Sequence, residues 1–459
     1  MSIEDVLTHI DSSADQDLAK WAELVAQPSI SAQDVGVREC AEILMNIMEQ
    51  SGITSQLYET QGNPVVYGEV LSDLSDAFTI LFYGHYDVQP PEPYDEWISP
   101  PFEPTLREGR LYGRGTADNK GQLLAHVFAV RSYLHTHGSV PINVKFIFDG
   151  EEESGSPSLR PFVEANRDLL AADLVYTSDG PMNEDGTPVV FFGVRGSLSI
   201  EVELETGRHD NHSGNKGGLI PNAAWEMVNL LSSMRDRDGN ITIEGFGDDV
   251  RKPTDTEMRL IRDLPYDQVN TAKVFGVDNI ILDKEDFYLN LMFRPTLTIN
   301  GLESGYTGLG TKSVIPCKAR AKIDVRLVPD QDPDTIFNVI EKYIAANQTE
   351  ASIVRLKSEK GVPPSRTPTD LPSAQAVIRT VGLSYDSKPM VMSSLGATLP
   401  DFIWTDLLDT PSIMVPYANA DETNHAPNEN MTLECFYAGI RTSARVIQEL
   451  GRLGGKAGD

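Results

Sequence analysis

An apolar run leads directly into acidic residues at 142–153, where the sequence is Ile142–Asn143–Val144–Lys145–Phe146–Ile147–Phe148–Asp149–Gly150–Glu151–Glu152–Glu153. The run is short, rich in β-branched and aromatic residues and bounded by glycine, which is typical of a strand. Three more predicted strands run on to a histidine or a carboxylate: Thr79–Tyr83 to His85 and Asp87, Leu174–Thr177 to Asp179, and Ser412–Pro416 to His425. In an open α/β sheet, ligands bind beyond the carboxyl ends of the strands. We therefore expect these acids and imidazoles to converge at one edge of a sheet.

A cluster of carboxylates at the edge of the sheet would favour bound cations. Carboxylates that lie close together stay ionised only if cations neutralise them. Two divalent metal ions with a spare glutamate are typical of a hydrolase. Zinc suits ligation by histidine and carboxylate, and manganese or cobalt would fit the same ligands.

Composition limits the class of protein. A chain of 459 residues predicts two domains, and its formal charge of −30 argues against nucleic acid and anionic membranes as partners. Three scattered cysteines predict no disulfide framework. The acidic first ten residues do not resemble a signal peptide, and no apolar run approaches the ~20 residues that span a bilayer. We expect a cytoplasmic protein.

Each motif, taken alone, leaves two interpretations open. Asp87 is a candidate acceptor for the second ring nitrogen of a ligand histidine at His85, but His-x-Asp also occurs in ordinary turns. Asp118 lies in the glycine-rich segment 113–121 before a helix, where it could bridge two ions or only cap the helix. Of Glu152 and Glu153, one could bind metal and the other accept a proton from water, whereas an acidic run alone usually forms a solvated surface.

The pattern of elements changes near Gly193. From there to about Asp386 the predicted order is strand, helix, strand, strand, helix, strand, interrupted by a polar excursion from Asn240 to about Asp286. This βαββαβ order is ferredoxin-like. We therefore predict an α/β protein with a mixed sheet, whose catalytic domain (1–194 and 388–459) is interrupted by an inserted domain (195–387).

Two residues of the insertion are candidates for substrate contacts. His212, in Asp210–Asn211–His212–Ser213–Gly214, could polarise a carbonyl oxygen after domain closure or subunit contact, or could be an ordinary loop histidine. Arg326 follows a strand and could clamp a substrate carboxylate with two hydrogen bonds, or form a surface ion pair.

Several motifs together resemble a known family. They are Gly84–His85–Tyr86–Asp87–Val88–Gln89–Pro90, Gly113–Arg114–Gly115–Thr116–Ala117–Asp118–Asn119–Lys120–Gly121, Glu151–Glu152–Glu153–Ser154–Gly155–Ser156 and Arg326–Leu327–Val328–Pro329. They resemble the dinuclear metallopeptidases of the aminoacylase, carboxypeptidase and dipeptidase group, most closely the branch of carnosinase and cytosolic nonspecific dipeptidase. This resemblance implies a zinc-exopeptidase-like catalytic domain. The resemblance covers nearly the whole chain.

The resemblance implies a role for each site residue. His85 and Asp179 would hold one metal, Glu153 and His425 the other, and Asp118 would bridge them. Glu152 would be the general base for attack by a metal-activated water, and Asp87 would orient His85.

It also implies roles for the insertion, which in this family is a lid and dimerisation domain. His212 would reach the active site of a partner subunit in a homodimer and stabilise the oxyanion. Arg326 and Ser313 would bind the substrate carboxylate.

The sequence departs from the family at one substrate-binding segment. Where the family often has Arg-Glu-Gly-Gly-Ser-Ile-Pro, this chain has Ser393–Ser394–Leu395–Gly396–Ala397–Thr398–Leu399–Pro400. Thr398 would replace the serine hydroxyl, whereas the Arg–Glu pair is missing. We expect hydrolysis of dipeptides or short peptides, and the missing pair leaves N-acyl amino acid deacylation, of aminoacylase or desuccinylase type, as the alternative. A catalytically silent relative is disfavoured because all five ligands and Glu152 are present.

Overall fold

The computed structural model describes residues 1–358 and 361–454. The chain divides into two compact units. Unit 1 comprises Met1–Gly193, Arg366–Ser393 and the chain from Ile403 onward, and unit 2 comprises Val194–Ser365 and Ser394–Phe402. Each unit has its own sheet and its own core.

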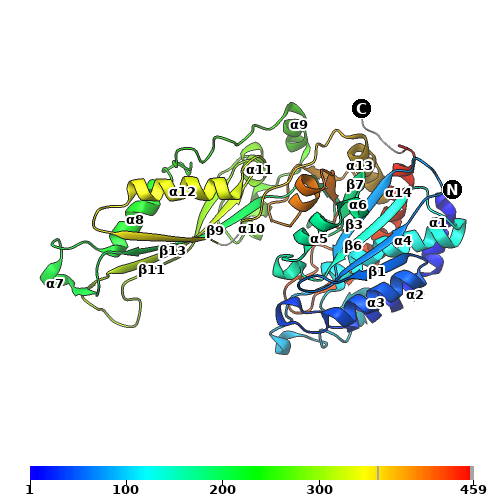
Figure 1. Ribbon diagram of the computed structural model, residues 1–459, viewed down its shortest axis with the longest axis horizontal. Coiled ribbons are helices and arrows are strands. Elements are labelled where there is room, and N and C mark those ends of the chain that lie inside the picture. Colours follow the sequence, from blue (N-terminus) through cyan, green and yellow to red (C-terminus); the bar gives the residue numbers. More distant parts are fainter. Residues whose placement is uncertain (359–360, 455–459) are drawn as a thin grey trace. The chain divides into compact units, whose positions relative to one another are not determined.

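Unit 1 is built on an eight-stranded mixed sheet (Figure 1). Its strands, in spatial order, are β1 (Thr54–Tyr58), β2 (Val65–Val70), β6 (Asn143–Asp149), β3 (Thr79–His85), β7 (Leu174–Thr177), β16 (Ser412–Met414), β8 (Val189–Phe191) and β15 (Met390–Met392). The four central strands β6, β3, β7 and β16 are parallel to one another, whereas β2 pairs with β6 and β8 pairs with β16 in antiparallel fashion. Nearly all of β3 and β7 is buried, as expected for parallel strands covered on both faces. The parallel centre brings the carboxyl ends of these strands to one edge.

Helices cover this sheet. They are α1 (Ile3–Ser12), α2 (Ala14–Ala26), α3 (Val37–Gln50), α4 (Gln122–His137), α5 (Leu159–Ala165), α6 (Arg167–Leu170), α13 (Pro372–Ser384) and α14 (Leu433–Gly451). Helix α4 is buried over most of its length because it packs against both β3 and α14. A small sheet of β4 (Thr105–Arg107), β5 (Arg110–Tyr112) and β17 (Asn430–Thr432) completes the unit.

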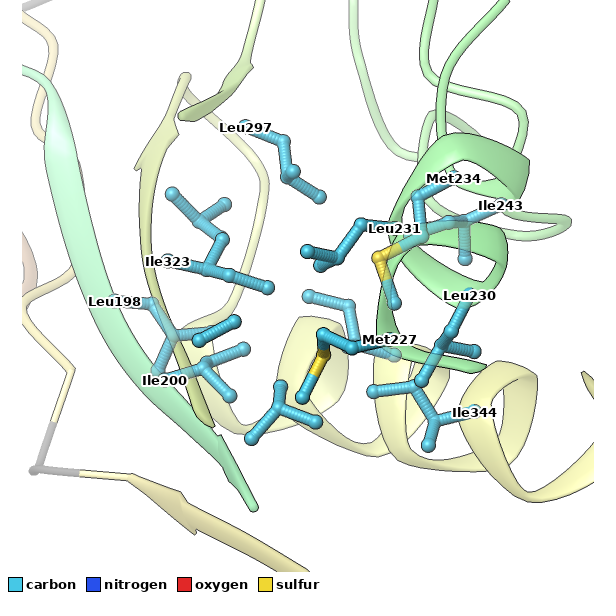
Figure 2. Packing of buried hydrophobic residues seen from close by; sticks show 14 of the residues in the cluster. Leu198, Ile200, Met227, Leu230, Leu231, Met234, Ile243, Leu297, Ile323 and Ile344 are labelled. Carbon is cyan, nitrogen blue, oxygen red and sulfur yellow. The ribbon is translucent and has the colours of Figure 1, made fainter. Parts of the chain in front are cut away.

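Unit 2 contains a four-stranded antiparallel sheet in the order β11 (Thr296–Ser304), β13 (Lys318–Leu327), β9 (Gly196–Glu205) and β14 (Ile353–Ser358). Side chains of β9 and β13 alternate between buried and more exposed positions, so that one face is apolar. Helices α8 (Ala223–Ser233) and α12 (Pro333–Asn347) pack on that face (Figure 1). Figure 2 shows Leu198, Ile200 and Ile323 of the sheet facing Met227 and Leu231 of α8 across this core.

The remaining elements of unit 2 are short. They are β10 (Asn211–His212), α7 (Ser213–Lys216), α9 (Asp255–Asp263), α10 (Gln268–Val274), α11 (Lys284–Met292) and β12 (Val314–Ile315). Helices α9 and α10 and the first residues of α11 occupy the segment from Asn240 to about Asp286 that the sequence suggested was a polar excursion. Thr254 and Glu257 form a reciprocal capping box at the start of α9.

The mixed α/β architecture predicted from the sequence is confirmed. Residues 366–387, which the sequence prediction placed in the insertion, carry α13, and this helix packs on α14 in unit 1. Among the described residues, we find no helix with the length and apolar character needed to cross a bilayer.

Candidate metal centre

The candidate site lies in unit 1, at the edge where parallel strands end. His85 is the last residue of β3, and its register partner on β6 is Asp149. Glu152 and Glu153 follow β6 in a single 3₁₀ turn, η4 (Glu152–Ser154). Asp179 lies two residues beyond the end of β7. Parallel pairing of β6, β3 and β7 therefore places these side chains together, as the sequence pattern predicted.

Asp118 occupies the middle of the cluster. It lies in the helical segment η3 (Thr116–Gly121) but has non-helical backbone angles, φ −115° and ψ 90°. Gly115 precedes the segment at φ +88°, and a Cβ on it would lie 2.6 Å from a methyl carbon of Val88, so only glycine fits there. This backbone turns the carboxylate of Asp118 toward two imidazoles. His85 Nε2 lies 3.0 Å from its Oδ1, and His425 Nε2 lies 3.1 Å from its Oδ2.

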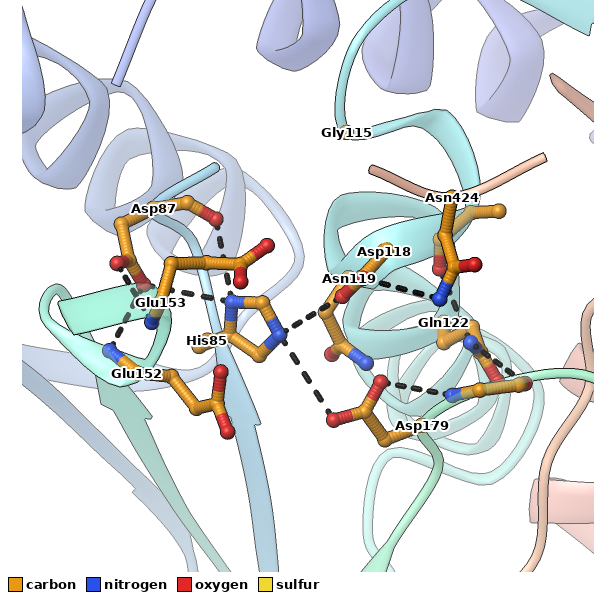
Figure 3. A network of polar contacts seen from close by, with 12 residues as sticks. His85, Asp87, Gly115, Asp118, Asn119, Gln122, Glu152, Glu153, Asp179 and Asn424 are labelled. Carbon is orange, nitrogen blue, oxygen red and sulfur yellow. Dashed lines mark hydrogen bonds and ion pairs between the residues drawn. The ribbon is translucent and has the colours of Figure 1, made fainter. Parts of the chain in front are cut away.

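Two groups of side chains that could hold a metal ion share Asp118. His85, Asp118 and Asp179 form one group, and Asp118, Glu153 and His425 form the other. Within each group the ligand atoms all lie within 4.8 Å of one another. His85 Nε2 is 3.8 Å from Asp179 Oδ2, and His425 Nε2 is 3.3 Å from Glu153 Oε2. Figure 3 shows His85 with Asp118 and Asp179 on the side of its Nε2 atom, and with Asp87 on the other.

His85 has the surroundings of a metal ligand. Its Nδ1 lies 3.1 Å from the backbone oxygen of Asp87 and 3.3 Å from the Asp87 carboxylate. Its buried Nε2 faces the carboxylates of Asp118 and Asp179, but no acceptor among the described residues meets it with hydrogen-bond geometry. An imidazole held through one nitrogen, with the other buried between two carboxylates, fits a cation.

The pKa shifts of the clustered side chains also favour a bound cation. Burial and the nearby Asp118 raise the pKa of Asp179 to about 7. Hydrogen bonding to Asp118 and then to Glu153 raises the pKa of His425 to about 10. Burial alone would lower the pKa of His85, but the carboxylates of Asp118 and Asp87 raise it well above its ordinary value. The cluster thus carries more negative charge than its imidazoles offset, and oxygen and nitrogen donors of this kind suit divalent ions.

The turn after β6 is fixed by Asp87. Its two carboxylate oxygens accept hydrogen bonds from the backbone N–H groups of Glu152 and Glu153, both at 3.1 Å. Gln89 donates through Nε2 to Glu153 Oε2 at 2.9 Å. Glu152 belongs to neither ligand group. Burial raises the pKa of its carboxyl well above the usual range, and the carboxylates of Asp179 and Glu153 raise it further.

The other candidate residues lie in unit 2, where they form two pairs. His212 is exposed, and its Nδ1 accepts a hydrogen bond from Gly214 N at 3.0 Å. Ser313 lies next to it, because the backbone oxygen of Ser313 accepts from Ser213 N at 3.2 Å. The second pair is Arg326 and Thr398, joined by a hydrogen bond of 2.9 Å from Nη1 to Oγ1. Arg326 also donates through Nε to Asp324 at 3.0 Å.

The sequence pattern missed several residues around the cluster. Gln89 and Asn424 contact ligand carboxylates, Asn424 through Nδ2 at 3.5 Å from Asp118 Oδ2. Glu429 accepts hydrogen bonds from the backbone of the Asp118 segment. Gln89 lies inside a motif already noted, whereas Glu429 bonds mainly to backbone N–H groups, which leave no complementary residue type to recognise in the sequence.

Comparison with known proteins identifies the family. The profile of Peptidase family M20/M25/M40 matches residues 81–449, which is most of the chain. The chain belongs to this family. The resemblance drawn from the sequence motifs is therefore confirmed, and the chain is a metallopeptidase.

Two curated relatives are dipeptidases. Human Beta-Ala-His dipeptidase is 30% identical over 404 residues, which cover 85% of this chain and 78% of the relative. The Cys-Gly metallodipeptidase DUG1 of Saccharomyces cerevisiae is 28% identical over 471 residues, covering 97% of this chain and 98% of the relative.

Solved structures show the same fold. The M20 family metallo-carboxypeptidase Sso-CP2 from Sulfolobus solfataricus is similar with a TM-score of 0.85 and 33% identity, covering 95% of this chain and 99% of that chain. Human carnosine dipeptidase 1 is similar with a TM-score of 0.77 and 27% identity, covering 98% and 99%.

Proposed function

We propose that the chain hydrolyses the peptide bond of dipeptides or short peptides with two divalent metal ions held in unit 1. The observation that carries the proposal is the pair of ligand groups that share the carboxylate of Asp118. One group has a single imidazole, His85, and the other has His425, so each ion would have one nitrogen donor and carboxylate oxygens. Zinc is the metal that we propose first, with manganese and cobalt as alternatives.

When bound, the two ions would polarise the substrate carbonyl and lower the pKa of the attacking water toward ~7. The chain supplies the proton transfers. Glu152 is the proposed general base because its carboxylate is partly buried beside the proposed ligands without belonging to either group. The hydrogen bond from its backbone N–H to Asp87 fixes the direction in which the side chain leaves the turn. A carboxylate oxygen of Glu152 would accept the proton of the water and deliver it to the leaving amine.

Unit 2 is proposed to be the ferredoxin-like lid and dimerisation domain of a homodimer. Its βαββαβ order of β9, α8, β11, β13, α12 and β14 supports this proposal. In this arrangement His212 would stabilise the oxyanion in the site of the partner subunit. Arg326, Ser313 and Thr398 would bind the substrate carboxylate, and the bond between Arg326 and Thr398 supports a shared role.

Dipeptides are the substrates we favour, because relatives that match most of the chain are named for dipeptide hydrolysis. N-acyl amino acid deacylation is the second candidate, and the absence of the Arg–Glu pair from the sequence at 393–400 is the observation that favours it. The three cysteines are free and buried, which supports a location in the cytoplasm.

A substrate panel tests the proposal. The purified chain, loaded separately with Zn²⁺, Mn²⁺ or Co²⁺, is assayed with dipeptides and with N-acetyl and N-succinyl amino acids. We expect turnover of dipeptides, loss of turnover on chelation and recovery when the metal returns. Turnover of the N-acyl compounds alone would establish the deacylase instead, and turnover of neither class would refute the proposal.

A further inference from the structure

Glu429 is a buried carboxylate that four N–H donors saturate. Arg114 Nη1 and Gly115 N donate to its Oε2 at 2.8 and 2.9 Å. Ala117 N and Asp118 N donate to its Oε1 at 3.0 and 3.1 Å. Its side chain is completely buried. All four donors belong to the short segment that carries Asp118, so one side chain fixes the backbone of that segment at several points.

The same residue also anchors the loop that carries His425. Glu429 follows His425 by four residues and directly precedes β17. Its backbone oxygen accepts a hydrogen bond from Gly113 N at 3.0 Å, and Asn430 then pairs with Tyr112 in the small sheet. Glu429 is therefore the physical link between two segments whose side chains belong to the second ligand group.

We propose that Glu429 is a positioning residue of the metal centre, which holds the Asp118 carboxylate where it faces both His85 and His425. The inference rests on the proposed function, because it takes Asp118 and His425 as metal ligands. Metal affinity depends on such supporting contacts, since ligands must keep their positions to within about 0.5 Å.

A glutamine at this position cannot reproduce the contacts. It is isosteric, but it has one acceptor oxygen where Glu429 has two, and its NH₂ group would face two N–H donors. Either Gly115 and Arg114 or Ala117 and Asp118 would lose their acceptor. The Asp118 segment would have to shift, although the fold elsewhere would keep its packing.

The competing explanation is that Glu429 only neutralises Arg114, with which it forms a fully buried ion pair. A double variant distinguishes charge neutralisation of Arg114 from positioning of Asp118. In Arg114→Met/Glu429→Gln no charge is left uncompensated, so fold stability should return toward that of the wild type. If Glu429 positions Asp118, metal affinity should stay low in the double variant.

Asp17→Asn is a matched control. Asp17 is buried and pairs with Arg131 and Ser13, which lie on α4 and before α2. Its substitution also disrupts a buried ion pair in unit 1, but it leaves the hydrogen bonds to the Asp118 segment in place.

The experiment titrates the metal-free full chain with Co²⁺ and follows binding by calorimetry and by the visible absorption of the bound ion. Thermal unfolding of the metal-free variants is measured in parallel. We expect Glu429→Gln to weaken Co²⁺ binding by about 10- to 100-fold and to change the absorption spectrum. Asp17→Asn should lower the unfolding temperature and keep the Co²⁺ affinity of the wild type.

Two results would overturn the inference. One is an affinity of Glu429→Gln within about twofold of the wild type, and the other is a double variant that regains affinity together with stability. If Glu429→Gln alone is recovered unfolded, the double variant and the wild type provide the same comparison. A wild-type chain that binds no Co²⁺ would refute the proposed function as well. If wild type and Glu429→Gln bind Co²⁺ equally well, only the positioning role of Glu429 is refuted and the proposed function stands.

Discussion

Three consecutive glutamates after β6 should give three different phenotypes when each is changed to glutamine. Glu151 accepts hydrogen bonds from Asn63 N at 2.8 Å and Ser158 N at 3.1 Å, so it holds two loops together. Glu152 belongs to neither ligand group, and Glu153 belongs to the group of His425. Each substitution replaces a carboxylate by an amide of the same shape. Differences among the three phenotypes therefore reflect the different contacts of the three side chains.

The contacts of each glutamate determine how far its substitution should change kcat, metal binding or stability. Glu152→Gln should lower kcat by about 10²- to 10⁴-fold, the usual contribution of a general base, while two metal ions remain bound. Glu153→Gln should weaken binding of one metal ion, because a neutral amide replaces a charged ligand. Glu151→Gln should keep kcat and metal content but lose roughly 1–3 kcal/mol of stability, since the amide NH₂ would face a backbone N–H donor.

The assay combines steady-state kinetics on a dipeptide, metal analysis after gel filtration and urea unfolding for all three variants. Normal turnover of Glu152→Gln would show that it is not the base. Equal loss of activity in Glu151→Gln and Glu152→Gln, with equal loss of metal, would show that the turn acts as one structural unit and would refute the separate roles.

Two further predictions concern other parts of the chain. Burial lowers the pKa of His126 to about 3 from an ordinary 6.5, so the unfolded chain binds a proton below pH 6.5 that the folded chain does not. The free energy of unfolding therefore has its full value above pH 6.5 and should fall by about 1.4 kcal/mol per pH unit as the pH drops toward 3. In His126→Phe the free energy of urea unfolding should depend less steeply on pH. The same pH dependence in wild type and variant would contradict the assignment. Arg326→Lys should raise KM for a dipeptide by roughly 10- to 100-fold, or ~1.4–2.7 kcal/mol, through loss of a charge-assisted hydrogen bond. KM for the C-terminal amide of the same dipeptide should change little. An equal effect on both substrates would show that Arg326 does not bind the carboxylate.

The sequence predicted the site edge well because the signal is local. The predicted strand at Leu174–Thr177 coincides with β7, and that at Ile142–Phe148 differs from β6 by one residue at each end. Strands of this kind are apolar throughout, and their first polar residues mark the edge of the sheet. Candidate catalytic or metal-binding residues at such an edge can therefore be named from the sequence alone.

Other features depend on contacts that leave no local pattern. Residues 1–50 contain three α-helices, and Ser13, which caps the end of α1 and the start of α2, separates the first two. The grouping of His85 with Asp179, and of Glu153 with His425, came from the resemblance and not from spacing. Three of the four donors to the Glu429 carboxylate are backbone N–H groups, which every residue type offers, so tertiary structure was needed to find these contacts.

Anomalous diffraction from crystals grown with zinc tests the central claim most directly. The account predicts two peaks in unit 1, one among His85, Asp118 and Asp179 and the other among Asp118, Glu153 and His425. Both should disappear in Asp118→Ala. A single peak away from Asp118, or no peak in crystals of the zinc-loaded active chain, would contradict it.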